Sequence, residues 1–203
     1  VAPAQKAAAV TSVLRQLIDI QPNTLVGLRN RALLIIGFAG AFRRSELVAL
    51  DVADVRVVHE GLEITVKQSK TDQEGAGHMK GLPYGSHPET CPVRTLRAWL
   101  DAAGVTDGPI FRSFTPRRQP QTKRLREYEV AKIIKRAAKK AGIDPAAFSG
   151  HSLRIGFVTA AYAAGVPEDA IMEQTGHRSI PTVRRYKRRA TLFTRNAAAQ
   201  VGL

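Results

Sequence analysis

Cysteine is nearly absent from this sequence, whose only thiol belongs to Cys91. A single cysteine cannot form an internal disulfide bond, which excludes a Cys-rich zinc module and fits a reducing, cytoplasmic compartment. Long hydrophobic runs are missing as well. The longest apolar stretch covers residues 32–42, whereas a membrane-spanning helix needs about 18 residues or more. We therefore expect this stretch to form a buried helix.

Acidic residues are scarce: 17 Asp and Glu stand against 31 Lys and Arg, which leaves a formal net charge of +14. Such an excess indicates a polyanionic partner, and nucleic acid is the first candidate. Charge alone leaves open a ribosomal-type or merely soluble basic protein. The start at Val1 shows neither an initiator methionine nor a signal-peptide pattern, so we expect a fragment or a processed chain.

The 203 residues are enough for one domain with a sizeable core or for two very small ones. Alternating β-branched residues predict a strand over 62–66, and a second extended segment over 79–84 completes a hairpin. Residues 104–128 carry little pattern and are predicted to form a long loop. Apolar periodicity predicts helices over 11–20, 29–42, 46–50, 92–103, 129–141, 152–164, 168–174 and 182–189. The predicted fold class is mainly α with a small antiparallel β-sheet (α+β).

Metal ligands also lack a recognisable arrangement in the sequence. His151 and His177 are not four residues apart, and neither has carboxylates at ligand spacing. Cleaving a phosphodiester without metal needs a nucleophile, fixed positive charge and an acid for the leaving oxygen. Tyr186 follows His177 by nine residues and comes directly after two arginines. Because a guanidinium matches two phosphate oxygens and keeps its proton, arginine-based stabilisation is the more economical interpretation.

Five clusters follow one another along the sequence, and their order is more specific than any one of them. The clusters are Gly40-Ala41-Phe42-Arg43-Arg44-Ser45-Glu46-Leu47, Ser69-Lys70-Thr71, His151-Ser152-Leu153-Arg154, Gly176-His177 and Tyr186. Together they resemble the tyrosine recombinase (phage integrase) family over about residues 24–190. The resemblance implies the catalytic-domain fold of that family, with a linker and helix remnant over 1–23, a catalytic domain over 24–190 and a tail segment over 191–203.

The resemblance assigns the bond-making and proton-transfer roles to three residues. Tyr186 would be the nucleophile and would leave a 3′-phosphotyrosine and a free 5′-hydroxyl. Lys70 would be the general acid for the 5′ oxygen, and His151 would accept a proton or position its neighbours. Because one ester replaces another, neither a nucleotide cofactor nor a metal is expected.

The resemblance assigns the charge-stabilising roles to two arginines and a histidine. Arg43, which precedes Ser-Glu-Leu by two positions, matches the first family arginine better than Arg44 does. Arg43 and Arg154 would hold the non-bridging oxygens, and His177 would donate a further hydrogen bond. Glu46 is expected to be a buried partner that orients an arginine or the backbone.

Each assignment has a simpler structural alternative. Arg43 could be a surface residue whose charge favours a helix end, and Ser152 could be only a helix cap. Lys67 and Lys80 lie on the same predicted hairpin as the proposed acid. Tyr186 could be an aromatic side chain on a basic DNA-contacting helix.

We interpret the sequence as the catalytic domain of a site-specific DNA recombinase or integrase. A type IB topoisomerase is the alternative enzyme, and a catalytically idle DNA-binding regulator is the alternative of another class. Full-length relatives usually carry an N-terminal helical domain that clamps the DNA, which these residues do not include. The basic segment 112–140 is expected to contact phosphates. It contains Arg112, Arg117, Arg118, Lys123, Arg124, Arg126, Lys132, Lys135, Arg136, Lys139 and Lys140.

The expected partner is double-stranded DNA, without a membrane. The family resemblance implies a homotetramer on DNA, and the charge of +14 suggests a monomer in free solution. The segment 191–203 presents apolar groups at Leu192, Phe193, Val201 and Leu203, and we expect it to dock on a neighbour or back on its own domain.

Overall fold

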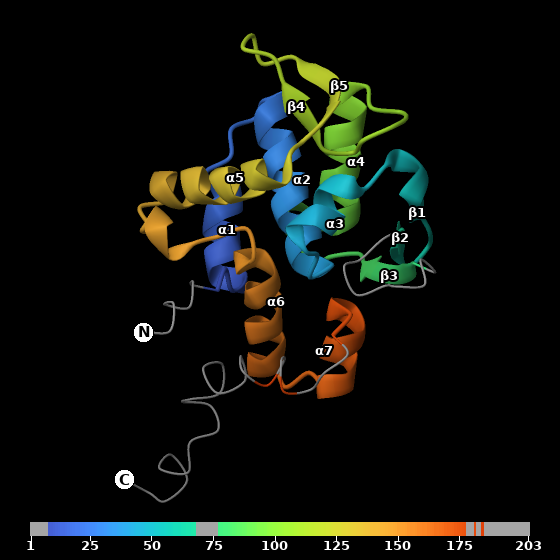
Figure 1. Ribbon diagram of the computed structural model, residues 1–203, viewed down its shortest axis with the longest axis vertical. Coiled ribbons are helices and arrows are strands. Elements are labelled where there is room, and N and C mark those ends of the chain that lie inside the picture. Colours follow the sequence, from blue (N-terminus) through green and yellow to red (C-terminus); the bar gives the residue numbers. More distant parts are fainter. Residues whose placement is uncertain (1–7, 68–76, 178–180, 182–183, 185–203) are drawn as a thin grey trace, which may run out of the picture.

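The computed structural model describes residues 8–67, 77–177, 181 and 184. Helices dominate this part of the chain, and two small antiparallel sheets accompany them (Figure 1), so the predicted fold class is confirmed. The helices are α1 (Thr11–Asp19), α2 (Leu25–Ala39), α3 (Arg44–Ala49), α4 (Pro92–Ala103), α5 (Glu127–Lys140), α6 (Ser152–Ala163) and α7 (Glu168–Thr175). The strands are β1 (Val55–Val57), β2 (Gly61–Val66), β3 (His78–Pro83), β4 (Arg112–Phe114) and β5 (Pro120–Arg124).

Helix α2 forms the centre of the main hydrophobic core. Its second half, residues 32–39, is apolar on all sides, and Leu33, Leu34 and Ile36 are almost completely buried. A helix with this pattern needs cover on every face, and α1, α3, α4 and α6 all pack against it. Its N-terminus is capped by the Thr24 hydroxyl, which accepts a hydrogen bond from the Gly27 amide at 3.3 Å.

The predicted hairpin is confirmed as β2 and β3, the last two strands of a sheet with the order β1-β2-β3. Alternation along β2 directs Leu62, Ile64 and Val66 into the core. The register places Ile64 opposite Lys80 and Val66 opposite His78. The hairpin tip, residues 68–76, lies outside the described residues.

The prediction of a long loop over 104–128 was wrong, because β4 and β5 pair there as an antiparallel hairpin. Neither strand shows the apolar alternation that sequence analysis depends on. The hairpin is held by anchors that are distant in sequence. Phe114 packs against Trp99, and the Arg124 guanidinium pairs with the Asp51 carboxylate at 2.6 Å. Arg118 occupies the turn with a left-handed φ of 61°.

Helices α6 and α7 lie together at one end of the molecule (Figure 1). They share a small hydrophobic cluster of Val158, Ala161, Tyr162 and Ile171 that is separate from the main core. The segment before α1 also approaches α6 closely, because a Cβ atom on Gly156 would lie 2.1 Å from the Ala9 carbonyl oxygen. The predicted helix over 182–189 falls outside the described residues, apart from Arg184. Within the described ranges, no helix is long and apolar enough to cross a membrane.

Candidate active site

Arg154 and His177 meet in the structure although 23 residues separate them. The Nη2 atom of Arg154 lies 3.0 Å from Nε2 of His177, and its Nη1 atom donates to the Ala41 carbonyl oxygen at 2.7 Å. Only 6% of the Arg154 surface is exposed. The first turn of α6, the second residue after α7 and the turn between α2 and α3 therefore converge on one guanidinium.

Hydrogen bonding determines which tautomer of His177 fits this arrangement. A guanidinium has no acceptor, so Nε2 of His177 must accept from Arg154. The proton then lies on Nδ1, which donates to the Thr175 hydroxyl oxygen at 2.7 Å. Thr175 is buried, and its hydroxyl donates in turn to the Ile171 carbonyl oxygen at 2.7 Å. The imidazole is therefore oriented from both sides.

Arg43 lies at the N-terminus of α3, held by Glu46 as expected. The Glu46 carboxylate, which is almost fully buried, accepts from Nη1 of Arg43 at 2.5 Å. Its other oxygen accepts from the Arg43 backbone amide at 2.9 Å, which closes the first turn of the helix. The Arg43 side chain remains 20% exposed. Arg44 instead reaches the Glu127 carboxylate of α5 at 3.3 Å.

His151 precedes α6 by one residue and is exposed. It lies one helical turn before Arg154, so the same helix start carries both residues. Ser152 is the first helical residue, and its hydroxyl oxygen accepts from the Ser149 amide at 2.9 Å. The N-cap position of α6 belongs to His151, whose side chain makes no capping hydrogen bond, so the alternative in which Ser152 caps the helix was wrong.

Two predicted site residues, Lys70 and Tyr186, lie outside the described residues. The structure therefore brings together Arg43, Arg154 and His177 through the α2–α3 turn, with His151 one helical turn away. Arg184, two positions before the predicted nucleophile, pairs with the Glu168 carboxylate at the start of α7 at 2.9 Å.

Sequence reasoning missed the role of Lys80. This lysine is 2% exposed, and its ammonium donates to the Gln174 carbonyl oxygen in the last turn of α7. Burial lowers the pKa of Lys80 to about 8; Glu46 opposes the shift, whereas Arg154 and Arg43 add to it. The alternation along the strand could have indicated this, because Lys80 lies two residues from Leu82 and so points to the same, buried side of the sheet. Met79 and Gly81 face outward.

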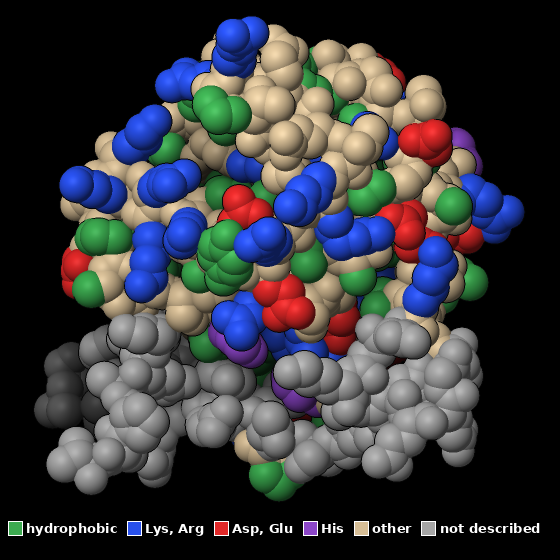
Figure 2. Space-filling model, turned by 45° about the horizontal axis from the view of Figure 1, so that its top comes forward, with side chains coloured by type: hydrophobic (Ala, Val, Ile, Leu, Met, Phe, Trp, Pro, Cys, Tyr) green, Lys and Arg blue, Asp and Glu red, His purple; other side chains and the backbone are tan. Residues whose placement is uncertain are grey.

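Basic side chains cover much of the molecular face shown in Figure 2, with histidine side chains near its lower border. The exposed side of α5 contributes an unbroken set of cations, since each of its lysines and arginines is exposed. These residues are Lys132, Lys135, Arg136, Lys139 and Lys140. Such a surface suits the phosphates of a duplex.

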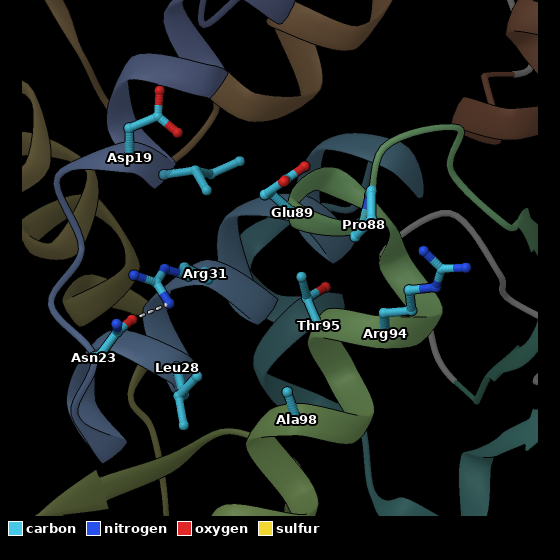
Figure 3. A pocket seen from close by; sticks show the side chains of 10 residues that line it. Asp19, Asn23, Leu28, Arg31, Pro88, Glu89, Arg94, Thr95 and Ala98 are labelled. Carbon is cyan, nitrogen blue, oxygen red and sulfur yellow. Dashed lines mark hydrogen bonds between the residues drawn. The ribbon is translucent and has the colours of Figure 1, made fainter.

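A cavity of about 510 Å³ lies elsewhere, between α1, α2 and α4. Figure 3 shows Arg31 pointing into it, with a hydrogen bond of 2.9 Å to the Asn23 side chain. Asp19, Glu89 and Arg94 also line it, so its charges are mixed. No predicted site residue borders this cavity.

Residues 11–192 match the family described as the phage integrase family. An integrase/recombinase xerD homolog of Selenomonas ruminantium is 43% identical over 173 residues, which make up 85% of this chain and 51% of the relative. Tyrosine recombinase XerD of Xanthomonas axonopodis pv. citri is 32% identical over 170 residues, with 81% and 52% covered. The chain thus spans about half the length of the curated relatives it matches.

Solved structures extend the likeness to the fold. The XerH site-specific recombinase bound to palindromic difH substrate, in a post-cleavage complex, has a TM-score of 0.75 at 21% identity, covering 97% of this chain and 53% of that one. The lambda integrase tetramer bound to a Holliday junction has a TM-score of 0.61 at 18% identity, with 92% and 49% covered. The fold is therefore that of a tyrosine recombinase catalytic domain. Because the family match includes all six predicted site residues and most of the sequence, this chain belongs to the phage integrase family.

Proposed function

We propose that this chain is the catalytic domain of a site-specific DNA recombinase that cleaves and rejoins strands through a 3′-phosphotyrosine. The observation that carries the proposal is the convergence of Arg154 and His177 beside the turn that leads to Arg43. The curated relatives are named recombinases. We also propose a cytoplasmic location and retain the division into residues 1–23, 24–190 and 191–203.

In the proposed reaction, the phenolic oxygen of Tyr186 attacks the phosphorus and the bond from phosphorus to the 5′ oxygen breaks. The phenol proton passes to an acceptor, for which the exposed His151 is placed at the start of α6. Lys70 gives its proton to the departing 5′ oxygen. Attack by another 5′-hydroxyl reverses these steps and restores a phosphodiester, so the chemistry conserves bond energy.

The described residues supply the fixed positive charge that a pentacoordinate phosphorus needs. Arg154 is already held by the Ala41 carbonyl oxygen and Arg43 by Glu46, so little reorganisation is required when the phosphate arrives. His177 accepts from Arg154 in the DNA-free arrangement. It donates to a phosphate oxygen through Nε2 only after gaining a proton there.

The surroundings of the two competing lysines support Lys70 as the acid. The Lys67 ammonium lies 2.6 Å from the Asp54 carboxylate, and this hydrogen bond raises the pKa of Lys67, which makes it a weaker acid. Lys80 is buried and bonded to Gln174, so it is shielded from a bound duplex. Neither is well placed to protonate a leaving oxygen.

Covalent trapping on a nicked duplex tests the proposal directly. Tyr186→Phe should bind DNA like the parent chain yet form no denaturant-resistant adduct. Arg154→Lys should bind DNA but form the adduct far more slowly, because lysine cannot hold two phosphate oxygens at once. An adduct formed by the Phe variant would exclude Tyr186 as nucleophile, and binding without any adduct in the parent chain would favour the DNA-binding regulator.

Two further assays separate the enzymatic alternatives. A substrate with a 5′-bridging phosphorothiolate, whose sulfur leaves without protonation, should restore cleavage by Lys70→Ala. Strand exchange between two cognate duplexes identifies a recombinase, whereas relaxation of supercoils by a monomer without exchange identifies a topoisomerase.

We also propose that the chain is a monomer in free solution and a homotetramer on DNA. One of the related structures is a tetramer on a Holliday junction. An apolar cavity of about 490 Å³ with Leu14, Ile35, Phe38 and Phe157 among its lining residues would suit apolar side chains such as those of segment 191–203. Light scattering with and without a cognate duplex checks the assembly; a stable tetramer without DNA, or normal exchange after deletion of 191–203, would contradict it.

A further inference from the structure

Lys80 occupies a strand position where an aliphatic side chain would be expected. It pairs across the sheet with Ile64, which is fully buried, and it is itself 2% exposed. Placing an ammonium in such a position is costly unless a specific contact compensates for lost hydration. The contacts of this one nitrogen should therefore show what the lysine does.

The Lys80 ammonium reaches the last turn of α7. It donates to the carbonyl oxygen of Gln174 and lies 5.3 Å from the centre of the Phe42 ring. A helix leaves its last carbonyls without partners inside the helix, and α7 ends at once because Gly176 takes a left-handed φ of 64°. A cation at this end also complements the helix dipole. Lys80 thus acts as a C-terminal cap supplied by a neighbouring strand.

Gln174 connects this cap to the candidate active site. Its side-chain amide donates to the Ala39 carbonyl oxygen at 2.8 Å, which joins α7 to the end of α2. The next residue, Thr175, accepts from Nδ1 of His177 at 2.7 Å. The imidazole in turn meets Arg154. A shift of the Gln174 peptide would therefore move the support of both phosphate-binding side chains.

Polar ties matter here because α7 contributes little to the main core. Its buried Ile171 belongs to the small cluster shared with α6. The Lys80 hydrogen bond is a direct polar link between β3 and the end of α7. The same strand follows directly on residues 68–76, which include Lys70.

We propose that Lys80 is a positioning residue that couples the β2–β3 hairpin to His177 and Arg154. This inference rests on the proposed function only for its effect on cleavage; the coupling itself is a property of the folded chain. The lysine would act by holding the end of α7 in the register that orients the imidazole, and would not donate a proton to DNA.

Lys80→Met tests the proposal, because methionine fills the same space without the charge or the donor. Lys67→Met is the matched control, since it removes an exposed lysine near the same hairpin. The Lys80 variant should form the covalent adduct about tenfold to a hundredfold more slowly, as expected for the loss of one charge-assisted hydrogen bond. Lys80→Arg should recover part of the rate by donating again to Gln174.

The phosphorothiolate substrate distinguishes positioning from acid catalysis. It should restore cleavage by Lys70→Ala but leave Lys80→Met slow. Rescue of Lys80→Met would show that Lys80 supplies the proton, which would overturn the proposal.

A structural measurement keeps the inference separate from the proposed function. Nitrogen NMR of His177 should show Nδ1 protonated in the parent chain and a mixture of tautomers in Lys80→Met. The Gly176 and His177 amides, which donate to carbonyl oxygens of α7, should exchange faster in that variant. Unchanged tautomer and exchange would refute the coupling even if cleavage fell. If no adduct forms in the parent chain, the proposed function fails while this result still decides the inference.

If Lys80→Met does not fold, the parent chain alone suffices. The chemical shift of the Gln174 carbonyl carbon should then change with pH at the same midpoint as the Lys80 side chain. The charges of Glu46, Arg43 and Arg154 also act on the pKa of this lysine. A Gln174 carbonyl shift that stays constant while Lys80 loses its proton would overturn the proposal.

Discussion

At the scale of single residues, Lys80 links site geometry to protein stability. Its pKa is lowered from 10.5 to about 8 by burial. Below pH 8 the folded and unfolded chains both hold the proton, so the cost of burying the charge is fully present. Between pH 8 and 10.5 the unfolded chain binds more protons than the folded one, and stability rises with pH.

We therefore expect the unfolding free energy of the parent chain to increase relative to that of Lys80→Met as pH rises. The difference should change by about 3 kcal/mol between pH 7.5 and 10.5, since each pH unit of pKa shift corresponds to about 1.4 kcal/mol. Urea unfolding of both proteins across this range measures it. Parallel pH profiles would mean that the lysine is not buried as a cation.

Glu46 makes a second prediction at this scale. Its carboxylate holds the Arg43 guanidinium and also closes the first turn of α3. Glu46→Gln keeps the size but weakens both interactions, so we expect stability to fall by about 1–2 kcal/mol. Adduct formation should slow as Arg43 loses its fixed orientation. Thermal unfolding and single-turnover cleavage check this, with Glu63→Gln, at an exposed ion pair with Arg56, as the control.

At the scale of elements, α5 is an amphipathic helix with separate tasks for its two faces. Val130, Ile133, Ile134, Ala137 and Ala138 are buried in the core, so the helix has a fixed place. From Lys132 to the end of the helix, every exposed side chain on the opposite face is a lysine or an arginine, so this face can meet a polyanion. The element is thus predicted to act in DNA binding without any role in bond chemistry.

Replacing Lys139 and Lys140 with glutamine should weaken binding to duplexes of any sequence. If each lysine neutralises one phosphate, the dependence of log affinity on log salt should become shallower by about 1.8 for the pair. Stability should change little because both side chains are exposed. Arg94→Gln with Arg97→Gln on α4 removes the same charge elsewhere, and an equal loss in that control would contradict a specific role for α5.

At the scale of the whole molecule, the separate cluster of α6 and α7 should open more easily than the main core. Trp99, the only tryptophan, is fully buried in the main core and donates to the Ile110 carbonyl oxygen at 2.8 Å. Its fluorescence reports main-core unfolding, whereas hydrogen exchange at α7 reports the small cluster. Two independent probes are therefore available in one chain.

Ile171→Ala should accelerate exchange in α7 about tenfold or more, because a buried isoleucine is worth about 2–5 kcal/mol. The Trp99 transition should move much less. Leu33→Ala, in the main core, should lower the stability that both probes report. If Ile171→Ala lowers the unfolding free energy measured by Trp99 as much as it lowers the opening free energy of α7, the two clusters unfold as one unit and this prediction is wrong.

Local patterns were enough for most of the architecture. The helices at α1, α4 and α5 and the β2–β3 hairpin follow from periodicity, because each buries one regular face. The order of the motifs also indicated the family, because order and spacing along the chain can be read from the sequence without a structure. The β4–β5 hairpin could not be predicted in this way, because its anchors, such as Arg124 to Asp51, are 73 residues apart.

Tertiary structure alone decided how the site is held together. The sequence motifs predicted Arg154 and His177 as site residues, but only folding placed their side chains 3.0 Å apart. The sequence likewise assigned the acid role to Lys70 and placed Lys67 and Lys80 on the same hairpin, but only burial distinguished Lys80 from the solvated Lys67. Periodicity records which face of one element is apolar, whereas a hydrogen bond between two elements depends on their packing, and packing is a property of the whole chain.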